Sequence, residues 1–141
     1  MGALDTVQAQ VYQGSGFTAV RGQGLRSTNP PHRVYEAAIG FPTAESAHAF
    51  VRSSANHWKA CAGQTVTVTN DNQTSPWTFA EVKGEPPRIA QRHTEGVPNG
   101  RVCQHVLSAV ARVVIEAQAC GLSITNEAGQ IADQMAARVK T

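Results

Sequence analysis

The sequence predicts an α+β fold: one twisted antiparallel sheet with two α-helices packed on one of its faces. Two segments place apolar residues at helical spacing, and a run of short segments rich in Val, Ile and Thr separates them. Helices grouped apart from hairpin-connected strands are typical of α+β domains. In addition, Cys103 and Cys120 lie equally far from the boundary between Ala111 and Arg112, which predicts a hairpin closed by a disulfide.

Two strands are expected before the first helix. Residues 17–28 favour a strand that Gly22 and Gly24 weaken, and residues 33–41 favour a second one. Residues 29–32 contain two prolines, and the residue before a proline is pushed out of the helical region. We therefore expect a turn between the two strands.

The first helix is expected directly after Pro42. Thr43 is a suitable N-cap, Glu45 lies in the first turn where a carboxylate favours the helix dipole, and Gly63 can end the helix in the left-handed conformation. Apolar and small residues recur on one face of this helix, namely Ala47, Phe50, Val51, Ser54, Trp58 and Cys61.

Three further strands should follow this helix. Residues 64–69 alternate Val with Thr as a half-buried strand does, and residues 70–76 form a polar turn. Residues 77–83 and 88–94 are the next two strand candidates, separated by a segment with Gly84 and two prolines.

The cysteine hairpin completes the predicted sheet. Val, Ile and Leu dominate both flanks of the turn at Ala111 and Arg112, so Cys103 and Cys120 should face each other across antiparallel strands. Directly opposed Cβ atoms lie roughly 4.5–5.5 Å apart, and a disulfide needs about 3.5–4.5 Å. Closing a loop of this length stabilises a fold by about 3 kcal/mol in the chain-entropy model. Such a bond implies an oxidising compartment.

A last helix is expected over residues 125–140. Arg138 and Lys140 would lie in its last turn, where cations favour the dipole. Its inner stripe is formed by Ala128, Ile131, Ala132, Met135 and Val139.

Composition narrows the class of protein. The chain has 141 residues, 41% of them hydrophobic, which suits a single folded domain. The net charge is only +2 and the basic residues form no dense run, which argues against binding to nucleic acid or to an anionic membrane. The chain start resembles no signal peptide. With the predicted disulfide, we therefore expect residues 1–141 to be one extracytoplasmic domain whose anchor or linker lies outside this chain.

The spacing of the histidines, cysteines and glycines does not favour a catalytic or metal site. His57 and Cys61 lie four positions apart on the helix, so a thiolate activated by an imidazole is one alternative. However, Cys61 continues the apolar stripe. The histidines match no zinc spacing, and neither a phosphate loop nor a dinucleotide-binding motif is present. We expect no metal, no cofactor and no catalysis.

Three residues are candidates for lining a ligand cleft. Trp77 opens a strand after a polar turn, so its ring is either a ligand platform or part of the core. Arg88 and Arg92 share one face of a strand with only Ala90 between them, so that face is either solvated or lines an anion-binding cleft. Glu116 follows an apolar run, and we expect it on the exposed face.

Four segments together resemble the PknH-like extracellular sensor domains of mycobacterial receptor Ser/Thr kinases and related lipoproteins. These segments are residues 41–44, 58–63, 113–121 and 131–139. The resemblance implies a role in ligand sensing or partner binding in the cell envelope, with a cleft over the sheet as the site.

The resemblance also implies a pattern of disulfides. Members usually have four cysteines in two bonds, and the pattern pairs Cys103 with Cys120. It would pair Cys61 with a cysteine near or before the N-terminus, which this chain lacks, so Cys61 is an unpaired thiol or one whose partner lies outside the chain.

The leading hypothesis is therefore a non-catalytic extracytoplasmic sensor, tethered to a membrane only through a segment outside this chain. It would bind an unidentified small molecule or an envelope protein. An envelope interaction module without a small-molecule ligand is the first alternative, and a thiol-dependent envelope enzyme is the second. A deep polar cleft would favour sensing, whereas a flat apolar patch would favour a protein partner.

Overall fold

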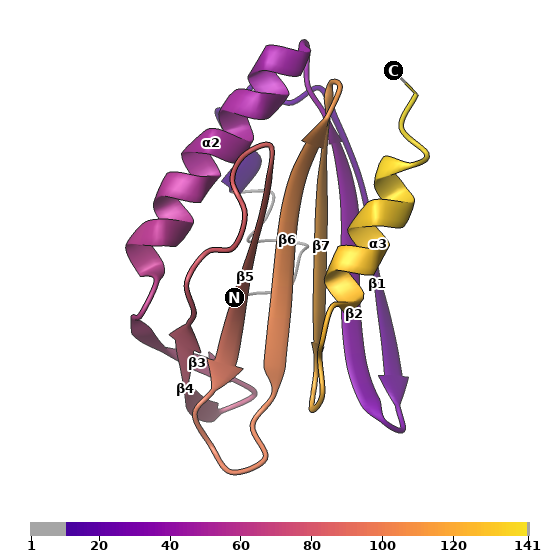
Figure 1. The fold of residues 1–141 in the computed structure, drawn as a ribbon. Helices are drawn as coiled ribbons and strands as arrows, with labels where there is room; N and C mark the ends of the chain where they lie inside the picture. Colours follow the sequence, from indigo (N-terminus) through magenta and orange to yellow (C-terminus); the bar gives the residue numbers. More distant parts are fainter. Residues whose placement is uncertain (1–10, 141) are drawn as a thin grey trace.

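In the computed structural model, which describes residues 11–140, the chain forms one open antiparallel sheet of seven strands in the order β1-β2-β7-β6-β5-β4-β3 (Figure 1). The strands are β1 Ala19–Thr28, β2 Pro31–Gly40, β3 Thr65–Asn70, β4 Gln73–Phe79, β5 Arg88–Glu95, β6 Val102–Val110 and β7 Val113–Gly121. The helices α2 Ala44–Cys61 and α3 Glu127–Ala136 pack against this sheet. The α+β class is confirmed.

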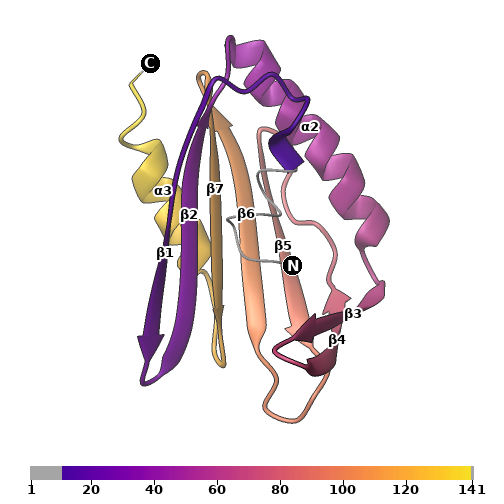
Figure 2. The same ribbon diagram turned by 180° about the vertical axis from the view of Figure 1, so that it is seen from behind.

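The two helices cover opposite faces of the sheet, so the expectation that both lie on one face is wrong. Leu107 of β6 packs with Val51 of α2 in one apolar cluster, whereas its neighbour Val106 packs with Ala132 of α3 in another. Successive side chains of a strand point to opposite faces. Figures 1 and 2 accordingly show α3 in front of the sheet in one view and α2 in front of it in the reverse view.

Strands β6 and β7 explain why the sheet has a helix on each face. Val114 and Ile115 are both fully buried although they point to opposite faces, and the same holds almost completely for Val106 and Leu107. Strands buried on both faces have continuous apolar runs instead of an alternating pattern. The hairpin therefore needs a helix on each side, and α2 and α3 each cover one. We call these sides the α2 face and the α3 face.

Helix α2 begins and ends as the sequence indicates. Its N-cap Thr43 accepts a hydrogen bond from the Ser46 amide at 3.0 Å, and Ser46 Oγ accepts one from the Thr43 amide at 3.1 Å. These reciprocal bonds form a capping box. Gly63 follows the helix with φ of 78°, in the left-handed region that glycine adopts without steric cost.

The cysteine hairpin is confirmed in register. Cys103 and Cys120 are directly opposed in β6 and β7, their Cα atoms lie 4.1 Å apart, and their sulfur atoms are bonded. The chain reverses at Ala111, which has φ of 50°, and Arg112. The disulfide therefore joins the two central strands on the α2 face, near the end of the hairpin that lies away from its turn.

Several boundaries differ from the sequence-based expectation. The turn before β4 needs only Asp71 and Asn72, both with positive φ, so β4 starts at Gln73 instead of at Trp77. Helix α3 ends at Ala136, so Arg138 and Lys140 lie beyond its last turn. At β4, polar side chains masked the boundary because a half-exposed strand and a loop have similar compositions. At α3, Val139 packs against the apolar cluster although it lies beyond the helix, so the apolar stripe continues past the helix end.

Candidate ligand-binding cleft

A cleft of about 200 Å³ lies on the α2 face, beside the part that helix α2 covers. One wall comes from β1 and β2, and the other from β3 and β4. The disulfide and Gln118 lie between these walls. The cleft is lined by Arg26, Ser27, Pro31, His32, Arg33, Tyr35, Val66, Val68, Ser75, Trp77, Phe79, Arg101, Cys103, Gln118 and Cys120.

The strand register explains why residues so distant in sequence meet here. One row of directly opposed residues crosses the α2 face from β1 to β4 in the order Arg26, Arg33, Cys120, Cys103, His93 and Phe79. The disulfide is thus at the centre of the row, with two arginines on one side and two aromatic rings on the other. A one-residue slip in any of these pairings would turn a side chain to the opposite face.

Tyr35 shapes the wall of the cleft above β1. It is directly opposite Gly24, and a Cβ built on Gly24 would lie 2.7 Å from Tyr35 Cε1. The tyrosine ring therefore lies against the glycine backbone in a space that no other residue would leave open. The glycine that appeared to weaken the first strand is the reason why the ring can line the cleft.

Trp77 is held in place by polar neighbours at the opposite wall. Its indole Nε1 donates to Ser75 Oγ at 3.2 Å, and the Arg101 guanidinium lies over the ring at 5.7 Å from the centroid. Only 8% of Trp77 is exposed, so the residue contributes to the core as well as to the cleft. The core interpretation of Trp77 is confirmed, and the residue also lines the cleft with a small exposed part of its surface. Its role as a ligand platform stays a prediction.

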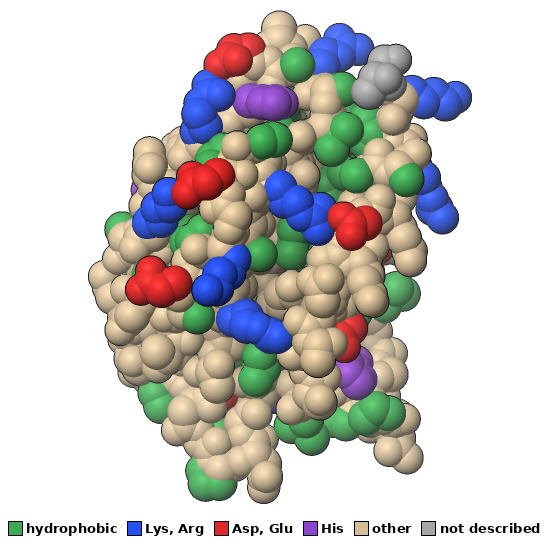
Figure 3. Space-filling view, in the orientation of Figure 1, with side chains coloured by type: hydrophobic (Ala, Val, Ile, Leu, Met, Phe, Trp, Pro, Cys, Tyr) green, Lys and Arg blue, Asp and Glu red, His purple; other side chains and the backbone are tan. Residues whose placement is uncertain are grey.

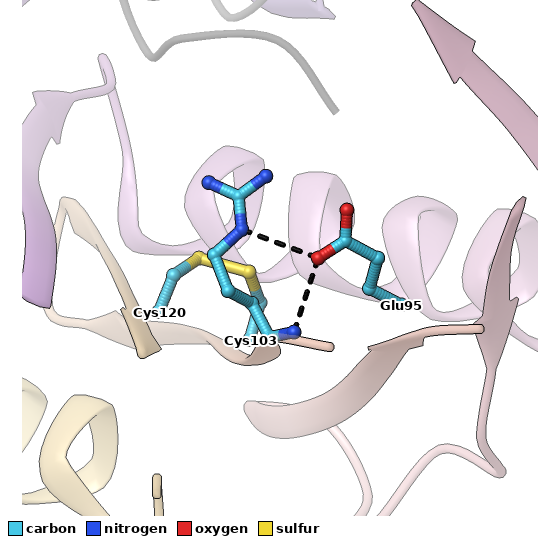
Figure 4. Close-up of a disulfide and its surroundings, with 4 residues drawn as sticks. Glu95, Cys103 and Cys120 are labelled. Atoms are coloured by element: carbon cyan, nitrogen blue, oxygen red, sulfur yellow. Dashed lines mark hydrogen bonds and ion pairs between the residues drawn. A yellow bond between two sulfur atoms is a disulfide. The ribbon is translucent and has the colours of Figure 1, made fainter. Parts of the chain in front are cut away.

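Glu95 fixes Arg101 beside the disulfide. Its Oε2 accepts a hydrogen bond from the Arg101 amide at 3.1 Å and one from Arg101 Nε at 3.3 Å, as Figure 4 shows. Burial raises the pKa of Glu95, but the bonds from Arg101 and Ser75 outweigh this and hold the pKa below its usual range. Glu95 is therefore ionised at neutral pH.

The two arginines of the other wall have no such partner. Arg26 and Arg33 are directly opposed on β1 and β2, and among residues 11–140 neither side chain makes a hydrogen bond or an ion pair. Like charges directly opposite each other destabilise a sheet. The cleft therefore has a cationic wall that no described carboxylate neutralises.

A second, more apolar cavity of about 180 Å³ lies next to the cleft, under helix α2. Phe79 and Gln118 line both spaces and separate them. Inside it, Glu116 accepts a hydrogen bond from Tyr12 Oη at 2.6 Å, and its other carboxylate oxygen lies 2.6 Å from His105 Nε2. Burial and this carboxylate raise the pKa of Tyr12 well above its usual value. The Tyr12 phenol is thus neutral and acts as a donor.

Glu116 was expected on an exposed face, and that expectation is wrong because only 4% of the residue is exposed. The carboxylate is stable there because Tyr12 and His105 satisfy its oxygen atoms. Tyr12 also stacks on Phe50 with ring centroids 4.6 Å apart, which closes the cavity. The sequence signal was a lone acid directly after the apolar run Val113–Ile115 of a strand.

His93 lines the second cavity and is 1% exposed. Burial and the nearby His105 lower its pKa to about 3. His93 is consequently neutral at physiological pH. Within the described part of the chain its Nδ1 has no hydrogen-bond partner.

Cys61 carries a free thiol at the end of α2, where it lines the second cavity. His57 is exposed, and no hydrogen bond joins it to Cys61 in the region that the structure describes. The arrangement therefore lacks the contact between imidazole and thiol that a nucleophilic pair needs. No group of three or more His, Cys, Asp or Glu suited to a metal ion occurs within residues 11–140.

Arg88 and Arg92 do not line the cleft, because their side chains lie on the α3 face. Arg92 donates to the carbonyl oxygens of Ile124 at 2.6 and 3.0 Å and of Thr125 at 2.7 Å. Arg88 pairs with Asp133 at 2.9 Å and donates to the Gly129 carbonyl at 3.1 Å. Both arginines thus hold α3 and the segment before it, and their face is not an open solvated surface.

The surface of the α3 face agrees with this assignment. In Figure 3, Lys and Arg side chains lie close to Asp and Glu side chains across the middle of the face. The structure thus brings Trp77, Cys103 and Cys120 together in the cleft and places the arginine candidates elsewhere. Sequence reasoning missed Arg26, Arg33, Tyr35 and Arg101 because their proximity depends on strand pairing between distant segments.

Comparison with known proteins gives one consistent result. The sequence profile of the PknH-like extracellular domain matches residues 1–138. The chain is 49% identical over 142 residues to the serine/threonine-protein kinase PknH of Mycobacterium bovis and of Mycobacterium tuberculosis, covering 98% of this chain but only 22–24% of those kinases. This chain therefore spans less than a quarter of the length of these relatives.

A solved structure supports the same relationship. The crystal structure of the extracellular domain of PknH from Mycobacterium tuberculosis superimposes with a TM-score of 0.86 at 46% identity, covering 94% of this chain and 70% of that chain. Among the helices that the structure describes, none has the length and apolar character needed to cross a membrane. The disulfide and the extracytoplasmic assignment agree with these matches. The chain belongs to the PknH-like extracellular domain family, and it is an extracytoplasmic domain.

Proposed function

We propose that this domain is the ligand-sensing part of an extracytoplasmic receptor, either a receptor Ser/Thr kinase or a lipoprotein of the cell envelope. It binds a ligand in the cleft on the α2 face and passes this event to a tethered partner. The domain itself is not catalytic. Any kinase activity belongs to a separate part of a longer protein.

The cleft around the disulfide is the observation that carries this proposal. Its walls combine arginines that have no ion-pair partner within residues 11–140 with aromatic and aliphatic side chains, and a disulfide fixes the two central strands between them. Such a mixture of apolar surface and a few convergent polar groups is typical of ligand sites. A site on rigid strands also needs little reorganisation when a ligand binds.

A partner protein remains the second candidate, and strand β1 favours it. All ten residues of this strand are exposed, and β1 forms one edge of the sheet that residues 11–140 build. Val20 and Leu25 each expose more than half of their surface. An exposed edge strand can pair with a strand of another protein. An envelope interaction module would use this edge instead of the cleft.

Nuclear magnetic resonance of the isotope-labelled domain tests these two functions against each other. Low-molecular-weight fractions of a mycobacterial envelope extract would be added, and shifts of the Trp77 indole and the Gln118 side-chain amide would be followed. Sensing predicts saturable shifts at both groups, which Tyr35→Ala weakens and the control Arg21→Gln does not. Arg21 lies on the same strand as Arg26, but its side chain points to the opposite face of the sheet.

Two outcomes would contradict the proposal. Shifts confined to β1, produced by a protein fraction and not by small molecules, would instead support the interaction module. Turnover of a component of the extract by the purified domain would reinstate an enzymatic role, and Cys61→Ser would then be the first variant to assay.

A further inference from the structure

We infer that the cleft takes an anionic amphiphile, that is, a molecule with a carboxylate or phosphate group attached to an apolar chain. This inference rests on the proposed function, because it names the chemistry of the ligand in the same cleft. The charges of one wall, the apolar surface of the other wall and the size of the space support it together.

The anionic group is assigned to the wall formed by β1 and β2. Arg26 and Arg33 are directly opposed there, and no described side chain neutralises them. Like charges on directly opposed residues repel each other, and an anion between them relieves this repulsion. Arginine donates two parallel hydrogen bonds to a carboxylate or phosphate, so this pair presents the donors that such a group requires.

Arg101 adds free guanidinium donors to the rim of the cleft, while its charge is paired with Glu95. Glu95 uses its Nε and its backbone amide, but a guanidinium has five donors, and both Nη groups have no hydrogen bond to another described residue. Among residues 11–140, no Asp or Glu lines the cleft. The space therefore has a positive potential, which concentrates anions and excludes cations.

The apolar part of the ligand is assigned to the opposite wall. Val66 and Val68 of β3 and Trp77 and Phe79 of β4 line this side. Val66 is 38% exposed, so a ligand chain that covers it would remove apolar surface from water. A simple inorganic anion leaves this wall uncovered, and a neutral lipid leaves the arginines unpaired. A molecule with both properties satisfies both walls.

The size of the cleft limits what it encloses. Its volume of about 200 Å³ is below the roughly 300–1,000 Å³ of sites that bury a whole drug-sized ligand. We therefore assign the acidic head group and the first carbon atoms to the cleft, with the head group near Arg33 and the chain crossing the disulfide toward β4. The remainder of a long chain would extend out of the cleft.

Binding of four small probes tests this assignment on the intact domain. The probes are decyl phosphate, decanoate, decyltrimethylammonium and inorganic phosphate, each kept below its critical micelle concentration and followed through the Trp77 indole resonance. We expect decyl phosphate and decanoate to bind, and a difference between them shows which acid is preferred. Decyltrimethylammonium should not bind, and inorganic phosphate should bind about tenfold or more weakly, since it forgoes the apolar wall.

Arginine variants test whether Arg26 and Arg33 bind the acidic group of the probe. Arg26→Gln together with Arg33→Gln should weaken decyl phosphate binding by about tenfold or more, because two charge-assisted hydrogen bonds are lost. Arg21→Gln is the matched control, since it removes one arginine from the same strand on the other face. Raising the salt concentration to ~0.5 M should weaken the binding of decyl phosphate to the parent domain. The same change should alter its affinity for the double variant only slightly.

The outcomes separate this inference from the proposed function. Equal binding of decyltrimethylammonium and decyl phosphate, with shifts at Trp77, would overturn the anionic assignment and leave the cleft as a ligand site. Equal binding of inorganic phosphate and decyl phosphate would overturn the apolar half of the assignment. If none of the probes binds, the inference fails, whereas the proposed function is judged by its own test with envelope extract.

Discussion

Two pairs of arginines on opposite faces of the same sheet have opposite roles. On the α3 face, Arg88 and Arg92 donate to backbone carbonyls of α3 and its leading segment, and Arg88 also pairs with Asp133. On the α2 face, Arg26 and Arg33 are directly opposed and have no partner within residues 11–140. The difference indicates that one pair contributes to folding, whereas the other is the pair to which we assign the acidic group of the proposed ligand.

The surroundings of the two pairs explain this difference. Helix α3 lies over its face, and its first turn is further fixed by Gln104, whose Oε1 accepts from the Ala128 amide at 3.1 Å. Buried carbonyls and amides require partners, and the arginines and Gln104 supply them. Helix α2 covers β5, β6 and β7 and leaves the cleft beside it open.

Removing the disulfide should have the largest effect on the α2 face. The double variant Cys103→Ala with Cys120→Ala opens a loop with a sequence separation of 17. It should lower the free energy of unfolding by about 3 kcal/mol in the chain-entropy model. Urea denaturation measures this change. Cys61→Ala is the control, and it should cost clearly less because its thiol closes no loop. Equal losses in both variants would mean that packing of sulfur, not the cross-link, stabilises this part of the sheet.

Acid should weaken the α2 face before the α3 face. His93 is neutral in the folded protein down to a pKa of about 3, whereas in the unfolded chain its pKa is near 6.5. Between these values the unfolded chain binds a proton that the folded protein does not. The free energy of unfolding should therefore fall by up to about 1.4 kcal/mol per pH unit as the pH decreases from 6.5 toward 3.

Two measurements test this pH dependence. His93→Gln should flatten the slope of stability against pH, whereas the exposed control His57→Gln should leave it unchanged. Hydrogen exchange at pH 4.5 should show amides of α2 losing protection before those of α3. An unchanged slope in His93→Gln would assign the effect to another group.

Breaking the arginine contacts on the α3 face should cost stability without affecting the cleft. Arg92→Gln removes a charged donor from the carbonyls of Ile124 and Thr125, so the free energy of unfolding should fall by about 1.5–3 kcal/mol. Thermal and urea denaturation measure this loss, with Arg21→Gln as an exposed control. Binding of any cleft ligand should persist. If Arg92→Gln were as stable as the parent domain, the carbonyls would have to be satisfied by water instead.

The sequence contained most of the fold because its signals are local. The cap at Thr43, the stop at Gly63 and the symmetric cysteines each depend on a few neighbouring residues, and all three are confirmed. The placement of the helices on one face was wrong for an equally local reason. Strands β6 and β7 contain consecutive apolar residues, Val106 with Leu107 and the run Val113–Ile115, which indicate burial on both faces instead of one.

The site was harder to predict than the fold. Trp77 was a candidate for a cleft and lines one. Arg88 and Arg92 were candidates only because their spacing places both side chains on one face of a strand, and Arg88 contacts α3 instead. Spacing shows that two side chains share a face, but not which element covers that face. Arg26 and Arg33 become neighbours only through the pairing of β1 with β2, and that pairing places them across the disulfide from Trp77.

The smallest predicted effect is a gain of stability, and it distinguishes the two arginine pairs most sharply. Arg33→Gln removes the like charge opposite Arg26, so the unliganded domain should become more stable by a few tenths of a kcal/mol, or about 0.2–1 kcal/mol at low salt. Arg26→Gln should give a similar gain, and the double variant should add little, because either change removes the same repulsion. Differential scanning calorimetry at low and high salt measures it. A loss of stability in Arg33→Gln would show that this arginine supports the fold, as Arg92 does, and the division of roles between the two faces would then be wrong.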